Sequence, residues 1–178
     1  MMVEPTGVER VLAPEDILVS RTDPRGRLTY VNDSFLAVTG YRDVDLLGRR
    51  HDVIRHPDMP RAVLRLLRAS LTARCVVFGY VVNLTSDGSH YWALAHIRPS
   101  FDRRGTVIGY DATAQAAGAA ALREVVPLYA RLVQEEQRHL NAASAIDAST
   151  ALLAAFLDDR RQTYDQLVWQ LITQGEAA

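Results

Sequence analysis

One short segment, residues 51–60, concentrates the side chains that could do chemistry. It holds two histidines, an arginine and two aspartates, and two prolines restrict its backbone. A guanidinium and an imidazole held in a rigid loop suit an anionic or polar heteroaromatic ligand, which they would bind through charge-assisted hydrogen bonds. From the residues alone, the alternative is that Arg55 pairs with Asp58 and that His56 caps the helix that follows.

A second group of polar and aromatic residues lies between positions 83 and 92. Alternate residues of a strand share a face, so Asn83, His90 and Trp92 are predicted to face one side. An amide and an indole on one face can bind a flat ring by edge hydrogen bonds and stacking. The alternative is that Tyr91 and Trp92 are core aromatics and that Asn83 ends a hairpin strand.

Several classes of function lack their motifs in this chain. It has no glycine-rich phosphate loop, no paired histidines at zinc spacing and no Gly-x-Ser-x-Gly elbow, so no enzyme is expected. The one cysteine, Cys75, excludes an internal disulfide and a multi-cysteine metal site. A net charge of −1 argues against a nucleic-acid partner. No apolar run approaches the ~20 residues of a membrane span, and the start lacks signal-peptide features, so a cytoplasmic location is expected.

The elements that must position these residues follow from hydrophobic periodicity. Residues 1–16 are predicted to be an N-terminal arm. Strands are predicted at 17–22, 27–31, 76–84, 90–98 and 106–113, and short helices at 32–38, 43–47 and 60–71. Asn32 is expected to cap the first helix, which ends before Gly40. This order predicts an α+β domain over residues 17–114, with a five-stranded antiparallel sheet and helices inserted between its second and third strands.

Residues 115–178 are predicted to form a helical tail. Helices are expected at 115–141 and 146–173, and Pro127 is expected to kink the first or to start a fresh one. The apolar stripes exceed what one small sheet can bury, which predicts a homodimer through the C-terminal helices. Its expected seam consists of Leu153, Leu157, Tyr164, Leu167 and Leu171. The alternative is a tail folded back on its own sheet domain.

Residues 22–113 resemble a PAS domain, specifically that of bacterial aerotaxis receptors. The Asn-Asp-x-Phe and Gly-Tyr motifs are generic to PAS domains, whereas Arg-His-Pro-Asp-Met-Pro together with His-Tyr-Trp is specific to this subfamily. The matching stretches keep the family's order: Thr22-Asp23, 30–35, Thr39-Gly40-Tyr41, Leu47-Gly48, 55–60, Asn83, Asp87-Gly88 and His90-Tyr91-Trp92.

The resemblance implies a redox or oxygen sensor of the kind used in aerotaxis and chemotaxis. Such a sensor holds non-covalent FAD between helices and sheet and signals through its C-terminal helices to a further protein, unidentified here. The positions that match the family's flavin-binding residues are Asn32, His51, Arg55, His56, Asp58, Asn83 and Trp92. Val77, with Phe78 beside it, stands where the family usually has a tryptophan, which reduces the stacking area.

Two other PAS functions stay open at this point: a cofactor-free dimerisation or protein-interaction module, and a haem-binding oxygen sensor. Haem needs an axial ligand, usually histidine, and the helix at 60–71 contains none. A cysteinyl-adduct light sensor would need a cysteine on the helical side, whereas Cys75 begins a strand. In the flavin case, reduction is expected to rearrange contacts around Asn83 and to shift the helix that begins near Ala114, bending at Pro127.

Overall fold

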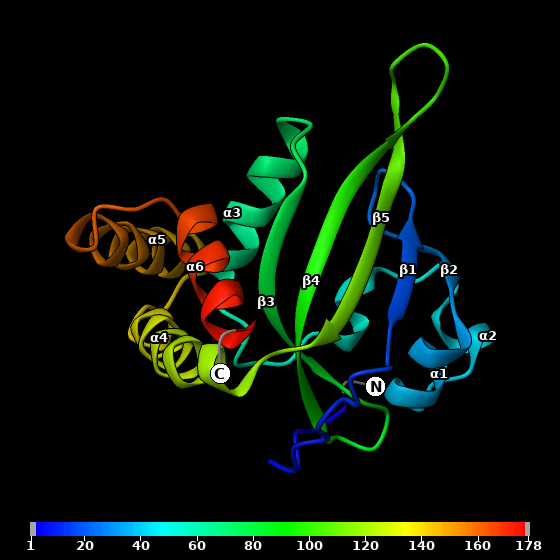
Figure 1. Ribbon diagram of the computed structural model, residues 1–178, viewed down its shortest axis with the longest axis horizontal. Helices are drawn as coiled ribbons and strands as arrows, with labels where there is room; N and C mark the ends of the chain where they lie inside the picture. Colours follow the sequence, from blue (N-terminus) through cyan, green and yellow to red (C-terminus); the bar gives the residue numbers. More distant parts are fainter. Residues whose placement is uncertain (1–2, 177–178) are drawn as a thin grey trace. The chain divides into compact units, whose positions relative to one another are not determined.

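Five strands form one antiparallel sheet in the order β2-β1-β5-β4-β3 (Figure 1). The computed structural model describes residues 3–176. The strands are β1 (Leu18–Thr22), β2 (Leu28–Val31), β3 (Val77–Leu84), β4 (His90–Phe101) and β5 (Val107–Ala116). Between β2 and β3 lie α1 (Asp33–Thr39), α2 (Asp43–Leu46), the 3-10 helix η1 (His51–Ile54) and α3 (Arg61–Thr72). The predicted α+β class and the place of its helices are confirmed.

The predicted boundaries of α1 follow local capping chemistry. The side-chain oxygen of Asn32 accepts a hydrogen bond from the backbone N–H of Phe35, which satisfies a donor of the first helical turn. At the other end Gly40 adopts a left-handed conformation, with φ of 71°, and its N–H donates to the carbonyl of Leu36. Both residues were readable in the sequence because caps depend on side chains close in the chain.

The chain divides into two compact units. The first runs to His56 and resumes with Ser70–Ala116, and the second combines Pro57–Ala69 with the residues from Ala117 onward. The sheet thus ends close to the predicted boundary at 114. The unexpected part is the beginning of α3, which groups with the tail although it is inserted between two strands of the sheet.

Aliphatic and aromatic side chains from the sheet, α1, α2 and η1 form the core of the first unit. Phe35 and Val38 come from α1, and Tyr91 and Ala93 come from β4. The remaining buried members are Leu12, Leu18, Leu28, Leu46 and Ile54. Burial of each large apolar side chain contributes about 1.5–3 kcal/mol, so this cluster fixes the helices against the sheet.

The tail contains three helices, α4 (Ala119–Gln137), α5 (Ala142–Asp159) and α6 (Tyr164–Glu176). The prediction of a single helix over 146–173 is therefore wrong. Arg161 lies between α5 and α6 with φ of 53°, a left-handed conformation that ends a helix. Thr163 and Gln166 then form a reciprocal capping pair that starts α6, since the N–H of each is accepted by the side chain of the other.

Pro127 interrupts neither the tail nor its first helix. It lies inside α4, which continues from Ala119 to Gln137, so the expected fresh start at this residue is wrong. A proline lacks the N–H that the carbonyl four residues earlier would accept, here the carbonyl of Arg123. The residues on both sides of Pro127 stay helical, and its neighbours Val125, Leu128 and Tyr129 are buried.

The five apolar residues predicted to form a dimer seam are buried inside the tail itself. They are Leu153, Leu157, Tyr164, Leu167 and Leu171, and each is at most 9% exposed. Both α5 and α6 contact α4, which contributes its own buried residues. The apolar stripes of α5 and α6 are therefore buried within one tail, and α4 contributes to their burial.

Candidate functional site

The segment around Arg55 is fastened to β3, an edge strand of the sheet. Arg55 forms an antiparallel bridge with Asn83, and the backbone N–H of His56 lies 3.4 Å from the carbonyl oxygen of Val82. Arg55 follows η1 directly, and its own N–H donates to the carbonyl of Asp52. Three of the predicted site residues, Arg55, His56 and Asn83, are thereby brought together.

The hairpin register assigns the polar residues of β3 and β4 to two faces. Asn83 is opposite Tyr91, and cross-strand partners share a face. His90 and Trp92 are opposite Leu84 and Val82, so they face the other side. The expectation that Asn83, His90 and Trp92 share one face is therefore wrong, because a one-residue offset in register moves a side chain across the sheet.

Asn83 and Tyr91 form the polar contact on the inner face. The side-chain amide nitrogen of Asn83 lies 3.4 Å from the hydroxyl oxygen of Tyr91 and donates to it. Tyr91 also belongs to the apolar core cluster. Burial raises the pKa of Tyr91 well above its ordinary value, with the Asn83 hydrogen bond opposing the shift, so its hydroxyl stays neutral. Tyr91 was expected only among the core aromatics; its place opposite Asn83 depends on the length of the loop at residues 85–89.

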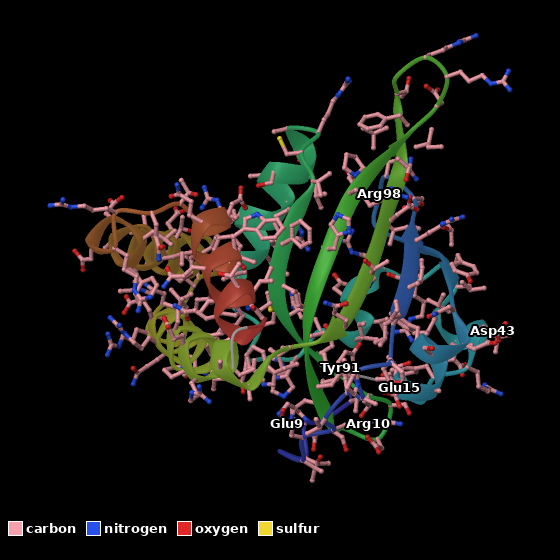
Figure 2. The ribbon with its side chains drawn as sticks, in the orientation of Figure 1. Glu9, Arg10, Glu15, Asp43, Tyr91 and Arg98 are labelled. Carbon is pink, nitrogen blue, oxygen red and sulfur yellow. The ribbon has the colours of Figure 1, made fainter. Side chains whose placement is uncertain are left out.

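His56 and His90 meet at the same end of the sheet. Their ring centroids are 5.3 Å apart and the rings are tilted by 51°. The N-terminal arm holds this end of β4: the N–H of His90 donates to the carbonyl of Val8, and the N–H of Arg10 donates to the carbonyl of His90. Figure 2 labels Arg10 and Tyr91 in this part of the structure. The N-terminal arm is thus hydrogen-bonded to the beginning of β4.

Asn32 and His51 are held near β1 rather than beside Asn83. Asn32 ties α1 to β1, because its oxygen also accepts the N–H of Val19 at 2.9 Å and its amide donates to the carbonyl of Ile17 at 2.8 Å. Nε2 of His51 lies 3.4 Å from the hydroxyl oxygen of Ser20. Burial lowers the pKa of His51, with Asp52 opposing the shift, and this favours the neutral imidazole.

The remaining predicted positions differ in exposure and place. The Arg55 side chain is exposed to solvent, and so is Asp58. Asp58 belongs to the second compact unit, whereas Arg55 and His56 end a stretch of the first. Trp92 is half-buried on the face opposite Asn83.

Val77 faces the same side of β3 as Asn83, and Phe78 faces the other. This follows from the alternation of a strand, in which every second residue shares a face. Phe78 stacks on His96 of β4, with ring centroids 4.5 Å apart and an interplanar angle of 14°. Phe78 thus cannot supply on the inner face the aromatic ring that Val77 lacks.

The inner face combines short apolar side chains with an amide and a nearby guanidinium. Gly79, Ala95 and Ala114 lie in register across β3, β4 and β5. At the end of β3, Asn83 offers both an amide donor and an amide acceptor, and Arg55 adds a permanent positive charge. An amide complements the carbonyl and imide edge of a flavin ring, and a guanidinium complements its phosphates. The chemical types of these side chains therefore match the groups that a flavin presents.

Among the described residues no helix has the length and apolar character needed to cross a membrane. The same part of the chain contains no group of three or more histidine, cysteine, aspartate or glutamate side chains that could hold a metal ion. Cys75 is exposed, in the turn between α3 and β3.

Known proteins share this arrangement and much of its sequence. Residues 28–114 match the family described as the PAS fold. The aerotaxis receptor of Escherichia coli (strain K12) is 36% identical over 121 residues, which cover 68% of this chain and 24% of the receptor. Phototropin-1A of Oryza sativa subsp. japonica is 33% identical over 89 residues, which cover 48% of this chain and 10% of that protein. The chain thus spans at most about a quarter of these relatives.

Solved structures agree on the fold. A light-oxygen-voltage domain, studied with a flavin analogue, superposes with a TM-score of 0.55 at 21% identity, covering 65% of this chain and 86% of that chain. The capped α1, the loop bridged to β3 and strands β2 to β4 lie within the segment that the family matches, whereas β1 precedes it and β5 ends just beyond it. That segment, residues 28–114, belongs to the PAS family and is similar in sequence to the aerotaxis receptor.

Proposed function

We propose that the chain is a cytoplasmic sensor module, not a catalyst, that binds a flavin, FAD in particular, and senses redox state or oxygen. The backbone bridge between Arg55 and Asn83 carries this proposal, because it places an arginine and an asparagine next to each other at the end of an inner face that includes small side chains. The similarity to the aerotaxis receptor and to a domain studied with a flavin analogue supports it.

Asn83 would hold the polar edge of the ring, and Arg55 would hold the pyrophosphate. A bound flavin supplies reversible uptake of electrons, which changes the protonation and hydrogen bonding of the ring edge. The amide nitrogen of Asn83 donates one hydrogen bond to Tyr91, and its second N–H and its oxygen are the groups that would meet the ring. Asn32 would act at a distance from the ring in this proposal, by fixing α1 to β1.

The proposal includes a homodimer and an output through the tail to a signalling protein. The five residues first expected at the dimer seam are excluded from it, since they are buried within one tail. Val126 and Trp169 are large apolar tail residues that the fold leaves exposed. Light scattering of the full chain measures the association state, and a monomeric mass at every concentration tested would contradict the homodimer.

Arg55→Ala tests the flavin site. We expect this variant to purify with little flavin, because the phosphates lose their charged partner. Arg103→Ala is the matched control: it removes an exposed arginine from the β4–β5 turn, far along the chain from the loop. Far-ultraviolet circular dichroism of both variants separates loss of binding from loss of fold.

Unchanged flavin content in a folded Arg55→Ala protein would contradict the assigned site. If wild-type protein and both variants are colourless even after reconstitution with FAD, the cofactor-free interaction module is the better account. The burial of Val77 in place of a tryptophan is the observation that favours that second function.

A further inference from the structure

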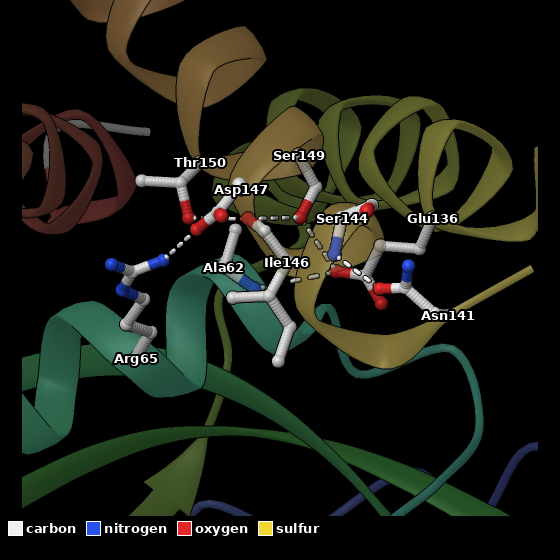
Figure 3. A network of polar contacts seen from close by, with 9 residues as sticks. All are labelled: Ala62, Arg65, Glu136, Asn141, Ser144, Ile146, Asp147, Ser149 and Thr150. Atoms are coloured by element: carbon white, nitrogen blue, oxygen red, sulfur yellow. Dashed lines mark hydrogen bonds and ion pairs between the residues drawn. The ribbon is translucent and has the colours of Figure 1, made fainter. Parts of the chain in front are cut away.

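The first turn of α3 receives its cap from the tail. Pro60 precedes the helix and has no side-chain acceptor to offer the N–H groups of the first turn. Those of Arg61 and Ala62 donate instead to one carboxylate oxygen of Glu136 on α4, at 2.7 and 3.3 Å. Figure 3 shows the contact of Ala62 with Glu136. A carboxylate at this position also complements the positive end of the helix dipole.

The same carboxylate reaches a third helix. The hydroxyl of Ser149 on α5 donates to Glu136 at 2.9 Å. Ser149 is completely buried, and the Glu136 side chain is 10% exposed. Arg61 adds a charged neighbour, with its Nε 3.9 Å from the other carboxylate oxygen. Glu136 thus joins α3, α4 and α5 at one point, which we call the Glu136 latch.

A second ion pair lies one turn further along α3. Arg65 is 2.6 Å from Asp147 on α5, but both side chains are more than half exposed. Exposed pairs contribute at most about 1 kcal/mol. The more buried Glu136 latch, with two hydrogen bonds from α3, is therefore the stronger link between α3 and the tail.

The latch is separated from the candidate site by very little chain. His56 is bonded to β3, and Arg61, whose N–H enters the latch, follows five positions later. Two of the four residues between them, Pro57 and Pro60, have a fixed φ, which reduces the conformational freedom of this short connection. A movement of the Arg55–His56 segment can therefore reach the N–H groups that donate to Glu136.

We propose that the Glu136 latch is the switch that couples the Arg55–His56 segment to the helical tail. With the segment in place, Glu136 caps α3 and holds Ser149; when the segment moves, the bonds to Arg61 and Ala62 break and α5 loses its anchor. This route runs through α3, whereas the sequence alone had suggested a route through β5 into α4. The proposal requires no particular ligand, so it stands or falls independently of the flavin.

Hydrogen exchange of the full chain tests the latch itself. In Glu136→Ala we expect amides 61–64 and 142–150 to exchange at least about fivefold faster, the effect of losing a helix cap. Glu135→Ala is the matched control, because this neighbouring carboxylate pairs with Arg138 and His139 on its own helix. Equal exchange in Glu136→Ala and wild type would overturn the proposal.

The coupling is tested by perturbing the Arg55–His56 segment in the wild-type protein and in the Glu136→Ala variant. His56→Ala removes a buried ring from the segment and should accelerate exchange of amides 142–150 when Glu136 is present. In the Glu136→Ala background it should add no further acceleration. If His56→Ala accelerated the exchange of amides 142–150 by the same factor with and without Glu136, the proposed coupling would be overturned. If Glu136→Ala unfolds the chain, Ser149→Ala replaces it; because this variant keeps the cap on α3, faster exchange is then expected at amides 142–150 only.

Discussion

The side-chain amide of Asn83 and the hydroxyl of Tyr91 meet across the β3–β4 ladder at 3.4 Å. Tyr91 is 1% exposed, so its hydroxyl has little access to water. The contact joins the residue with the best flavin-binding chemistry to the core of the domain. Any ligand that engages Asn83 therefore acts on the packing of Tyr91 as well.

Asn83→Ala should destabilise the domain by about 1–3 kcal/mol, because it leaves a buried hydroxyl without its partner. Tyr91→Phe should cost less, since it removes the hydroxyl together with its need for a hydrogen bond. In the double variant the two losses should not add. Urea unfolding of the four proteins measures the coupling energy, and strict additivity would show that the contact contributes nothing.

Asn32→Ala should destabilise the chain more than Asn141→Ala does. Both residues are N-caps, but Asn32 makes three hydrogen bonds to backbone groups whereas one is seen for Asn141. A cap alone contributes about 1 kcal/mol, and the two further bonds should raise the loss at Asn32 to roughly 2–3 kcal/mol. Urea unfolding measures both losses; equal values would mean that Asn32 serves only as a cap.

His51 should make the fold less stable in acid. Burial lowers its pKa below the ordinary value of 6.5, so below that pH the unfolded chain binds a proton more readily than the folded one. The contribution is fully present above pH 6.5 and is lost as the pH falls through the folded pKa.

The measurement for His51 is the free energy of unfolding between about pH 5 and 8, the range in which histidine titrates. His51→Gln should flatten the acid side of this curve, and His139→Gln should leave it in place. His139 is a suitable control because its ring is partly exposed beside Glu135. If the free energy of unfolding still fell at acid pH in His51→Gln, the effect would belong to another titratable group.

Leu153→Ala should destabilise the tail by about 2–5 kcal/mol, the usual cost of a cavity left by a buried leucine. Leu140→Ala is the matched control, since Leu140 is fully exposed between α4 and α5 and should change stability by less than about 0.5 kcal/mol. Thermal unfolding compares the two. If the Leu153→Ala protein were monomeric and as stable as a dimeric wild type, Leu153 would instead belong to a dimer interface.

Local signals made much of the fold predictable. Asn32 and Gly40 bound α1 through neighbours three or four residues away, and strand alternation located all five strands. The break between α5 and α6 had a local signal too, in the spacing of Thr163 and Gln166, but the continuous apolar stripe concealed it.

The candidate site was harder because it depends on register and on distant partners. Asn83 was identified, but its partner Tyr91 follows only from the exact pairing of the hairpin. The cap of α3 could not be predicted at all, since Glu136 is 75 residues away from Arg61. The sequence of α3 does not indicate which distant residue caps the helix.

The central claim is that this PAS domain holds a flavin, and the absorption spectrum of the freshly purified chain tests it most directly. We predict the two-banded spectrum of an oxidised flavin, bleached by dithionite and restored by air, with FAD released on acid denaturation. A Soret band would instead indicate haem. A protein that shows neither spectrum, and that fails to take up added FAD, would contradict the claim.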